Sequence, residues 1–151
     1  MGSVGSNLIF FLKNLPINKF NLIDKEVLSS ENIKRHLSGF SLLKINKADA
    51  LKIELKNANP LIEVGTRTQS VTTIIETEAD FINDCDFHIV AIGKTMIEEF
   101  ILNNLQQGKL TKPTFIFFFF FFLASGQLLF VMPGDAERAL ELIKKENYYY
   151  S

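Results

Sequence analysis

The sequence lacks the residues that a disulfide framework, a zinc site or a nucleic-acid surface would need. Its one cysteine, Cys85, cannot form an internal disulfide, and its two histidines, His36 and His88, are too far apart for the close spacing of zinc ligands. Sixteen Lys and Arg against 17 Asp and Glu give a formal net charge of −1, so no excess of one sign attracts the whole molecule to nucleic acid. These absences favour a reducing compartment and argue against a basic nucleic-acid binder.

The N-terminus also lacks the basic region that precedes the apolar stretch of a secretory signal. What is present is a chain of 151 residues, 47% of them hydrophobic, which is enough for one modest domain with a real core. This composition argues against disorder throughout the chain.

Apolar periodicity along the chain predicts helices and strands in alternation. We expect helices at 7–15, 47–57, 95–107 and 135–146, strands at 19–24, 61–66 and 87–92, and a long loop with helical turns at 25–44. Alternation of this kind indicates a mostly parallel sheet with helices on both sides, which is a three-layer, Rossmann-like α/β fold.

A run of six phenylalanines at 117–122 is the most unusual stretch of the sequence. It is typical of an inner strand, because aromatic residues favour strands and an inner parallel strand is apolar on both faces. The stretch 114–132 has no charge and reaches the length of a membrane span, so a transmembrane helix is a second interpretation. An artefact of gene prediction through a non-coding stretch is a third.

Four features together suggest a nucleotide site. They are a glycine-containing turn at 2–7, the helix that follows it, a strand ending in Asp24, and a helix that begins on Lys47. Nucleotides bind at the carboxyl ends of parallel strands, where helix N-termini and basic groups meet the phosphates.

Several stretches, taken in order, resemble one known family. They are Gly-Ser-Val-Gly-Ser-Asn at 2–7, Asn-Lys-Phe-Asn-Leu-Ile-Asp at 18–24, the segment 24–36, Asn-Lys-Ala-Asp-Ala at 46–50 closing on Asn-Pro at 59–60, and the strand and helix at 81–92 and 98–105. In this order they resemble the adenylating domain of the ThiF, MoeB and ubiquitin-like-protein activating enzymes. The resemblance assigns 1–116 to a partial adenylating domain and 117–151 to a Phe-rich segment with a C-terminal helix.

The resemblance implies a site for ATP and magnesium. It places Gly2 and Gly5 in the nucleotide loop, Asp24 on the ribose hydroxyls and Asn32 against the nucleotide. A turn or cap role remains the alternative for Asp24, and ordinary loop hydrogen bonding remains the alternative for Asn32.

Arg35 and Lys47 match phosphate-binding positions, where a fork of donors and a point charge would neutralise the triphosphate. Solvated surface charges are the alternative for each of them. Two further residues are predicted to be structural: Cys85 as a buried thiol and His88 as a core histidine.

An acid that active members place after the strand ending near Ala91 is absent here. The sequence reads Val-Ala-Ile-Gly-Lys-Thr at 90–95, so the metal would lack its main anchor and we assign no catalytic residue and no metal ligand to this chain. The resemblance therefore points to a non-catalytic half, closest to the small subunit of the SUMO-activating enzyme.

That assignment implies a heterodimer with a catalytic subunit, a ubiquitin-like protein as a second partner, ATP and magnesium held mainly through the partner subunit, and a place in the nucleus and cytoplasm. Three alternatives remain: the regulatory subunit of the NEDD8-activating enzyme, a homodimeric adenylyltransferase for a sulfur-carrier protein, and a non-enzymatic membrane-anchored protein.

The family's first strand would precede Gly2, and its later strands are only faintly matched after Phe117. We therefore expect a fold without that first strand and with a degenerate C-terminal part, from a fragment or faulty gene model of a longer subunit.

Overall fold

The computed structural model describes residues 2–31, 40–119 and 126–148. The chain divides into two compact units, Met1–Ile74 and Ile75–Ser151, and each is considered by itself.

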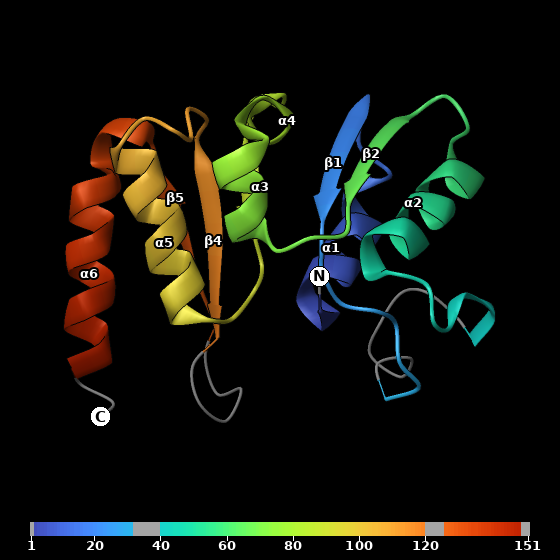
Figure 1. Cartoon of the computed structure of the whole chain (residues 1–151), viewed down its shortest axis with the longest axis horizontal. Coiled ribbons are helices and arrows are strands. Elements are labelled where there is room, and N and C mark those ends of the chain that lie inside the picture. Colours follow the sequence, from blue (N-terminus) through green and yellow to red (C-terminus); the bar gives the residue numbers. More distant parts are fainter. Residues whose placement is uncertain (1, 32–39, 120–125, 149–151) are drawn as a thin grey trace. The chain divides into compact units, whose positions relative to one another are not determined.

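Helices and strands alternate along much of the chain, as Figure 1 shows, except that α4 follows α3 and β5 follows β4. The first unit contains α1 (Ser3–Leu12), β1 (Lys19–Ile23), η1 (Phe40–Leu42), α2 (Lys47–Ala58) and β2 (Glu63–Arg67), and α3 (Val71–Thr77) crosses its boundary. The second unit contains α4 (Ala79–Asn83), β3 (His88–Val90), α5 (Thr95–Gln106), β4 (Thr114–Phe119), β5 (Gly126–Val131), η3 (Pro133–Asp135) and α6 (Ala136–Tyr148). The predicted α/β class is confirmed.

In the first unit, β1 and β2 form a two-stranded parallel sheet with Lys19 opposite Glu63 and Ile23 opposite Arg67. Every second side chain of β1 points toward the helices, so Phe20 and Leu22 are buried against them. The buried cluster contains Ile9 from α1, Phe20 and Leu22 from β1, Ala48, Leu51 and Leu55 from α2, and Ile62 and Val64 around β2. Since the two strands are parallel, their carboxyl ends lie at one edge, next to the start of α2.

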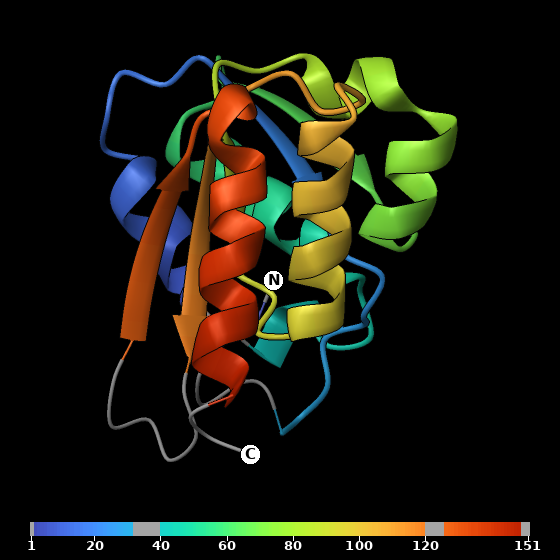
Figure 2. The same cartoon turned by 90° about the vertical axis from the view of Figure 1, so that its left-hand side faces the viewer.

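In the second unit, the strand order is β3-β4-β5, with β3 parallel and β5 antiparallel to the central β4. Helices α5 and α6 run side by side on one face of this sheet (Figure 2). Leu102 of α5, Ile116 of β4 and Val131 of β5 are almost completely buried between these layers.

Three phenylalanines of the homopolymer, 117–119, lie in β4, which confirms a strand for that part of the run. These three residues pair only with β5, in antiparallel register, because the pairing with β3 ends at Ile116, so the expected inner parallel strand is wrong for them. Residues 120–122 lie outside the described part of the chain. On one face of the strand, the ring of Phe115 packs against Phe87 and Phe130, with centroids 5.7 and 4.6 Å apart. Both described ends of the stretch 114–132 form paired strands, and in the described ranges no helix is long and apolar enough to cross a membrane.

One local expectation was wrong, and two short helices were missed. The glycine-containing segment 2–7 forms no turn: Gly2 is the N-cap of α1 with φ of −75°, and Gly5 is buried inside that helix. Leu8, Ile9 and Leu12 stand at helical spacing with no proline among them, so the helix extends back through Gly5 at a cost of about 1 kcal/mol. The short helices α3 and α4 were not predicted at all.

Candidate functional site

The carboxyl edge of the β1–β2 sheet brings Asp24 and Arg67 together. Asp24 follows β1 directly, and its backbone N–H donates to the carbonyl oxygen of Arg67, the last residue of β2, at 3.1 Å. Asp24 is only 8% exposed. A carboxyl group is therefore held at the place where the parallel strands end, as the sequence predicted.

The Asp24 side chain also orders the loop that follows it. Its Oδ1 accepts a hydrogen bond of 2.8 Å from the backbone N–H of Glu26, an i-to-i+2 contact of the kind that Asp makes in turns. The turn role considered for Asp24 is thus present in the structure, while its ribose role stays a prediction.

Asn46 joins the end of β1 to the start of α2. Its Oδ1 accepts a hydrogen bond from Ala48 N–H at 2.8 Å, which caps the helix, and its Nδ2 donates to the carbonyl oxygen of Asp24 at 2.8 Å. Sequence analysis did not select Asn46 as a site residue. An Asn directly before an amphipathic helix is a standard N-cap signal, so this cap was open to prediction.

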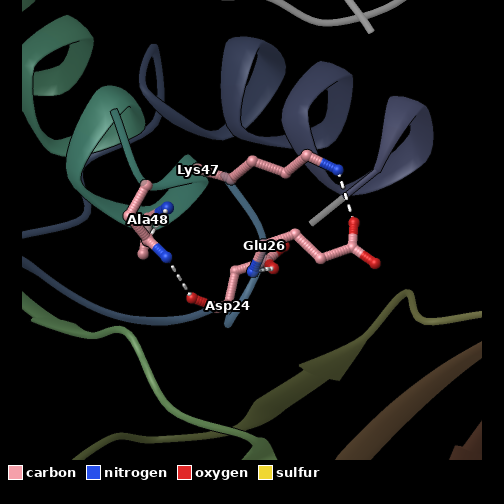
Figure 3. A network of polar contacts seen from close by, with 5 residues as sticks. Asp24, Glu26, Lys47 and Ala48 are labelled. Carbon is pink, nitrogen blue, oxygen red and sulfur yellow. Dashed lines mark hydrogen bonds and ion pairs between the residues drawn. The ribbon is translucent and has the colours of Figure 1, made fainter. Parts of the chain in front are cut away.

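Lys47, the first residue of α2, is buried and paired. The residue is 4% exposed, and its Nζ lies 2.6 Å from Oε2 of Glu26, whose side chain is half exposed. The Lys47 backbone N–H donates to the carbonyl oxygen of Glu26 at 2.9 Å. Figure 3 shows these contacts beside Asp24. The alternative that Lys47 is a solvated surface charge is therefore wrong, and the sequence analysis did not single out Glu26, its partner in this network.

The other predicted nucleotide residues are placed only in part. Gly2 and Gly5 lie at the start of α1, where Ser6 N–H donates to the Gly2 carbonyl oxygen at 3.0 Å. Asn32 and Arg35 lie outside the described residues. The structure thus brings Asp24 and Lys47 together in one polar network, and the nucleotide-binding roles of all six residues stay predictions.

In the second unit, the loop after β3 contains Gly93, Lys94 and no carboxylate of its own. Gly93 has φ of 67° and donates its N–H to Oε1 of Glu98 at 3.1 Å. Glu98 is 2% exposed, and burial raises the pKa of its carboxyl group, although hydrogen bonds from the backbone of Gly93 and Lys94 oppose that shift. Glu98, which lies in α5, thus holds the loop after β3 by accepting the Gly93 hydrogen bond.

His88 and Cys85 are built into the second unit as structural groups. The two ring nitrogens of His88 lie 3.2 Å from Thr114 Oγ1 and 2.9 Å from the carbonyl oxygen of Ile82, and burial lowers the pKa of the ring. The Cys85 thiol lies 3.3 Å from the same carbonyl oxygen, and burial, with help from Asp86 and Asp84, raises its pKa. The ring is therefore a hydrogen-bonded structural histidine, although it is only partly buried. Cys85 is also only partly buried, so the prediction of a buried thiol is wrong in degree, and its raised pKa disfavours a nucleophilic thiolate.

No set of three or more His, Cys, Asp or Glu side chains in the described ranges is arranged to hold a metal ion. The chemistry available at the carboxyl edge of the first unit is that of a buried carboxylate and a buried ammonium group next to a helix N-terminus. Such groups suit the hydroxyls and phosphates of a nucleotide.

Solved structures share this fold at low sequence identity. PaaA is 23% identical over 78% of this chain and 35% of its own, with a TM-score of 0.64. The E. coli tRNA N6-threonylcarbamoyladenosine dehydratase TcdA, in complex with AMP, is 19% identical over 75% of this chain and 46% of its own, with a TM-score of 0.64. A structure of E. coli MccB with ATP is 16% identical over 78% and 35%, with a TM-score of 0.62. This chain therefore spans between a third and a half of the length of these proteins.

No curated protein matches the chain in sequence. The model of the ThiF family, however, matches residues 1–112, which is about three quarters of the chain. The ordered motifs, the parallel strands and the acid at their carboxyl edge agree with that match, and the chain belongs to the ThiF family.

Proposed function

We propose that this chain is a non-catalytic subunit of a ubiquitin-like-protein activating enzyme, with the SUMO-activating enzyme as the first candidate. In this role it pairs with a catalytic subunit and supports the ATP-dependent adenylation of the modifier's C-terminus by that partner. Such a heterodimer works in the nucleus and cytoplasm.

One contrast supports this proposal. The first unit keeps Asp24 and Lys47 in a buried polar network at the carboxyl edge of its sheet. The loop after β3 has Gly93 and Lys94 where an active member needs an acid for magnesium, and the nearby Glu98 carboxyl group is buried and bonded to that loop. A chain with nucleotide-holding groups but no metal anchor suits a supporting role better than a catalytic one.

The test is ATP–pyrophosphate exchange, measured for the full chain alone and for the chain mixed with the catalytic subunit of the SUMO-activating enzyme from the same source. We expect exchange above background only with the partner, together with co-elution of the two chains in size-exclusion chromatography. An Asp24→Asn variant should lower the exchange of the mixture. Equal exchange by the isolated chain and by the mixture would refute the proposal.

The same assay separates the alternatives. Exchange without any partner, abolished by Asp24→Asn, would identify a homodimeric adenylyltransferase for a sulfur-carrier protein. Stimulation only by the catalytic subunit of the NEDD8-activating enzyme would move the assignment to that pathway.

A further inference from the structure

The ammonium group of Lys47 is already occupied by a carboxylate. Its Nζ lies 2.6 Å from Glu26 Oε2, inside the range of a charge-assisted hydrogen bond. The side chain of Lys47 is 5% exposed, whereas that of Glu26 is 54% exposed. The lysine side chain is thus enclosed by its surroundings, whereas the glutamate side chain reaches solvent.

Glu26 is held in this position through its backbone. Its N–H donates to Asp24 Oδ1 at 2.8 Å, and its carbonyl oxygen accepts the N–H of Lys47 at 2.9 Å. The residue therefore stands between the buried acid at the end of β1 and the first residue of α2, and the three residues form one continuous chain of contacts (Figure 3).

Lys47 lies at a position that favours the binding of a phosphate group. It opens a helix of 12 residues at the carboxyl edge of two parallel strands, where the helix dipole favours an anion. A phosphate that approaches the ammonium group must displace the Glu26 carboxylate or accept its repulsion.

Resting on the nucleotide site of the proposed function, we infer that Glu26 is a specificity-determining residue that competes with the phosphate groups of a nucleotide for Lys47. The competition lowers the affinity for a nucleoside triphosphate and leaves the affinity for the nucleoside itself almost unchanged. The phosphate groups of a nucleotide therefore add little to the affinity that this chain has for the nucleoside alone.

The test compares ATP, AMP and adenosine binding to the full chain by isothermal titration calorimetry at low salt. Glu26→Gln should tighten ATP binding about tenfold and leave adenosine within about twofold, because a neutral amide neither repels phosphate nor neutralises the ammonium group. AMP should fall between the two. Adding Lys47→Met to Glu26→Gln should remove the gain.

Glu63→Gln is the matched control. It makes the same chemical change at another ion pair of the first unit, since Glu63 Oε1 lies 2.9 Å from Lys19 Nζ with the two side chains 69% and 33% exposed. We expect no change in the ratio of ATP to adenosine affinity. A gain in this variant equal to that of Glu26→Gln would reduce the effect to net charge and overturn the inference.

Loss of its partner leaves the Lys47 ammonium group buried and unpaired, so far-UV circular dichroism must confirm that Glu26→Gln is folded. Should it fail to fold, Glu26→Asp carries the test. Its carboxylate is one methylene shorter, which lengthens the contact with Lys47, and ATP should gain about threefold over adenosine.

An unchanged or lower ratio of ATP to adenosine affinity in the folded variant overturns the inference. So does a gain that survives Lys47→Met. If Asp24→Asn weakens adenosine binding in the same experiment, the nucleotide site stands even though the role of Glu26 has failed. Binding of neither ligand to any variant also overturns the inference, while the exchange assay with the partner still tests the subunit role separately.

Discussion

Replacing Asn46 by alanine removes two hydrogen bonds that join the end of β1 to the start of α2. Loss of the N-cap bond to Ala48 N–H costs about 1 kcal/mol. Loss of the bond from Nδ2 to the Asp24 carbonyl oxygen, which is partly buried, costs about 1 kcal/mol more. We therefore expect the free energy of unfolding of Asn46→Ala to fall by about 2 kcal/mol.

Two further variants separate these contributions. Asn46→Asp keeps an acceptor for the cap but loses the donor to Asp24, so it should lose about 1 kcal/mol. Asn59→Ala is the control, because the bond from Leu61 N–H to Asn59 Oδ1 is exposed, and its loss should stay within about 0.5 kcal/mol.

Urea unfolding followed by far-UV circular dichroism measures these differences. A loss of 2 kcal/mol moves the midpoint by about 1 M urea at a slope of about 2 kcal/mol per M. Adenosine affinity should fall in the same variant, since the bond from Asn46 positions the chain at Asp24. A midpoint shift for Asn46→Ala no larger than that of Asn59→Ala would refute the reasoning.

Three further predictions concern the second unit. Burial holds the pKa of His88 below its usual 6.5, so the unfolded chain binds the proton more readily and stability falls as the pH drops below about 6.5. The decrease of the urea midpoint between pH 7.5 and 5.5 should therefore be smaller in His88→Gln than in the wild type. An equal decrease would contradict this assignment. Burial raises the pKa of Glu98 above its usual 4.5, so the ionised acid weakens the fold at higher pH. The urea midpoint of Glu98→Gln, relative to that of the wild type, should therefore be highest at pH 7.5 and should fall toward pH 4.5. A relative midpoint that rises toward low pH would refute the direction of this pKa shift. Ile116→Ala should lower the free energy of unfolding by about 2–5 kcal/mol, since this side chain is fully buried, while Leu61→Ala, at a 93% exposed position, should stay within about 0.5 kcal/mol in the same urea titration.

The elements that could be predicted from the sequence are those with a clear start signal and a full apolar period. The helix expected at 47–57 is found as α2, Lys47–Ala58, because a capping Asn precedes it and Asn59 and Pro60 follow it. Helices α3 and α4 have seven and five residues, too few to establish a helical period, and their short length explains why they were missed.

The glycine-containing turn shows the opposite failure. A pattern of two glycines near a helix suggested a phosphate loop, but glycine permits a turn without requiring one. The apolar period of the following residues was the stronger signal, and it carried α1 back to Ser3.

The site was predictable one residue at a time but not as a network. Strand order and polarity placed Asp24 at the carboxyl edge, and the helix start placed Lys47 next to it. The pairing of Lys47 with Glu26 depends on where two long side chains point, which spacing alone does not fix. An acid two positions after Asp24 was the visible signal, and it went unused.

Thr114 gives β4 a fixed starting point that the phenylalanines cannot give. A strand made of one repeated side chain presents the same faces after a shift of one residue, so its alignment with β5 must be set elsewhere. Thr114 is fully buried, donates from Oγ1 to the Lys112 carbonyl oxygen at 3.1 Å and lies opposite His88. A residue inserted between Thr114 and Phe117 would turn the later side chains of β4 to the opposite face. The three codons from Thr114 to Ile116, between this anchor and the tract, therefore tolerate no change in number.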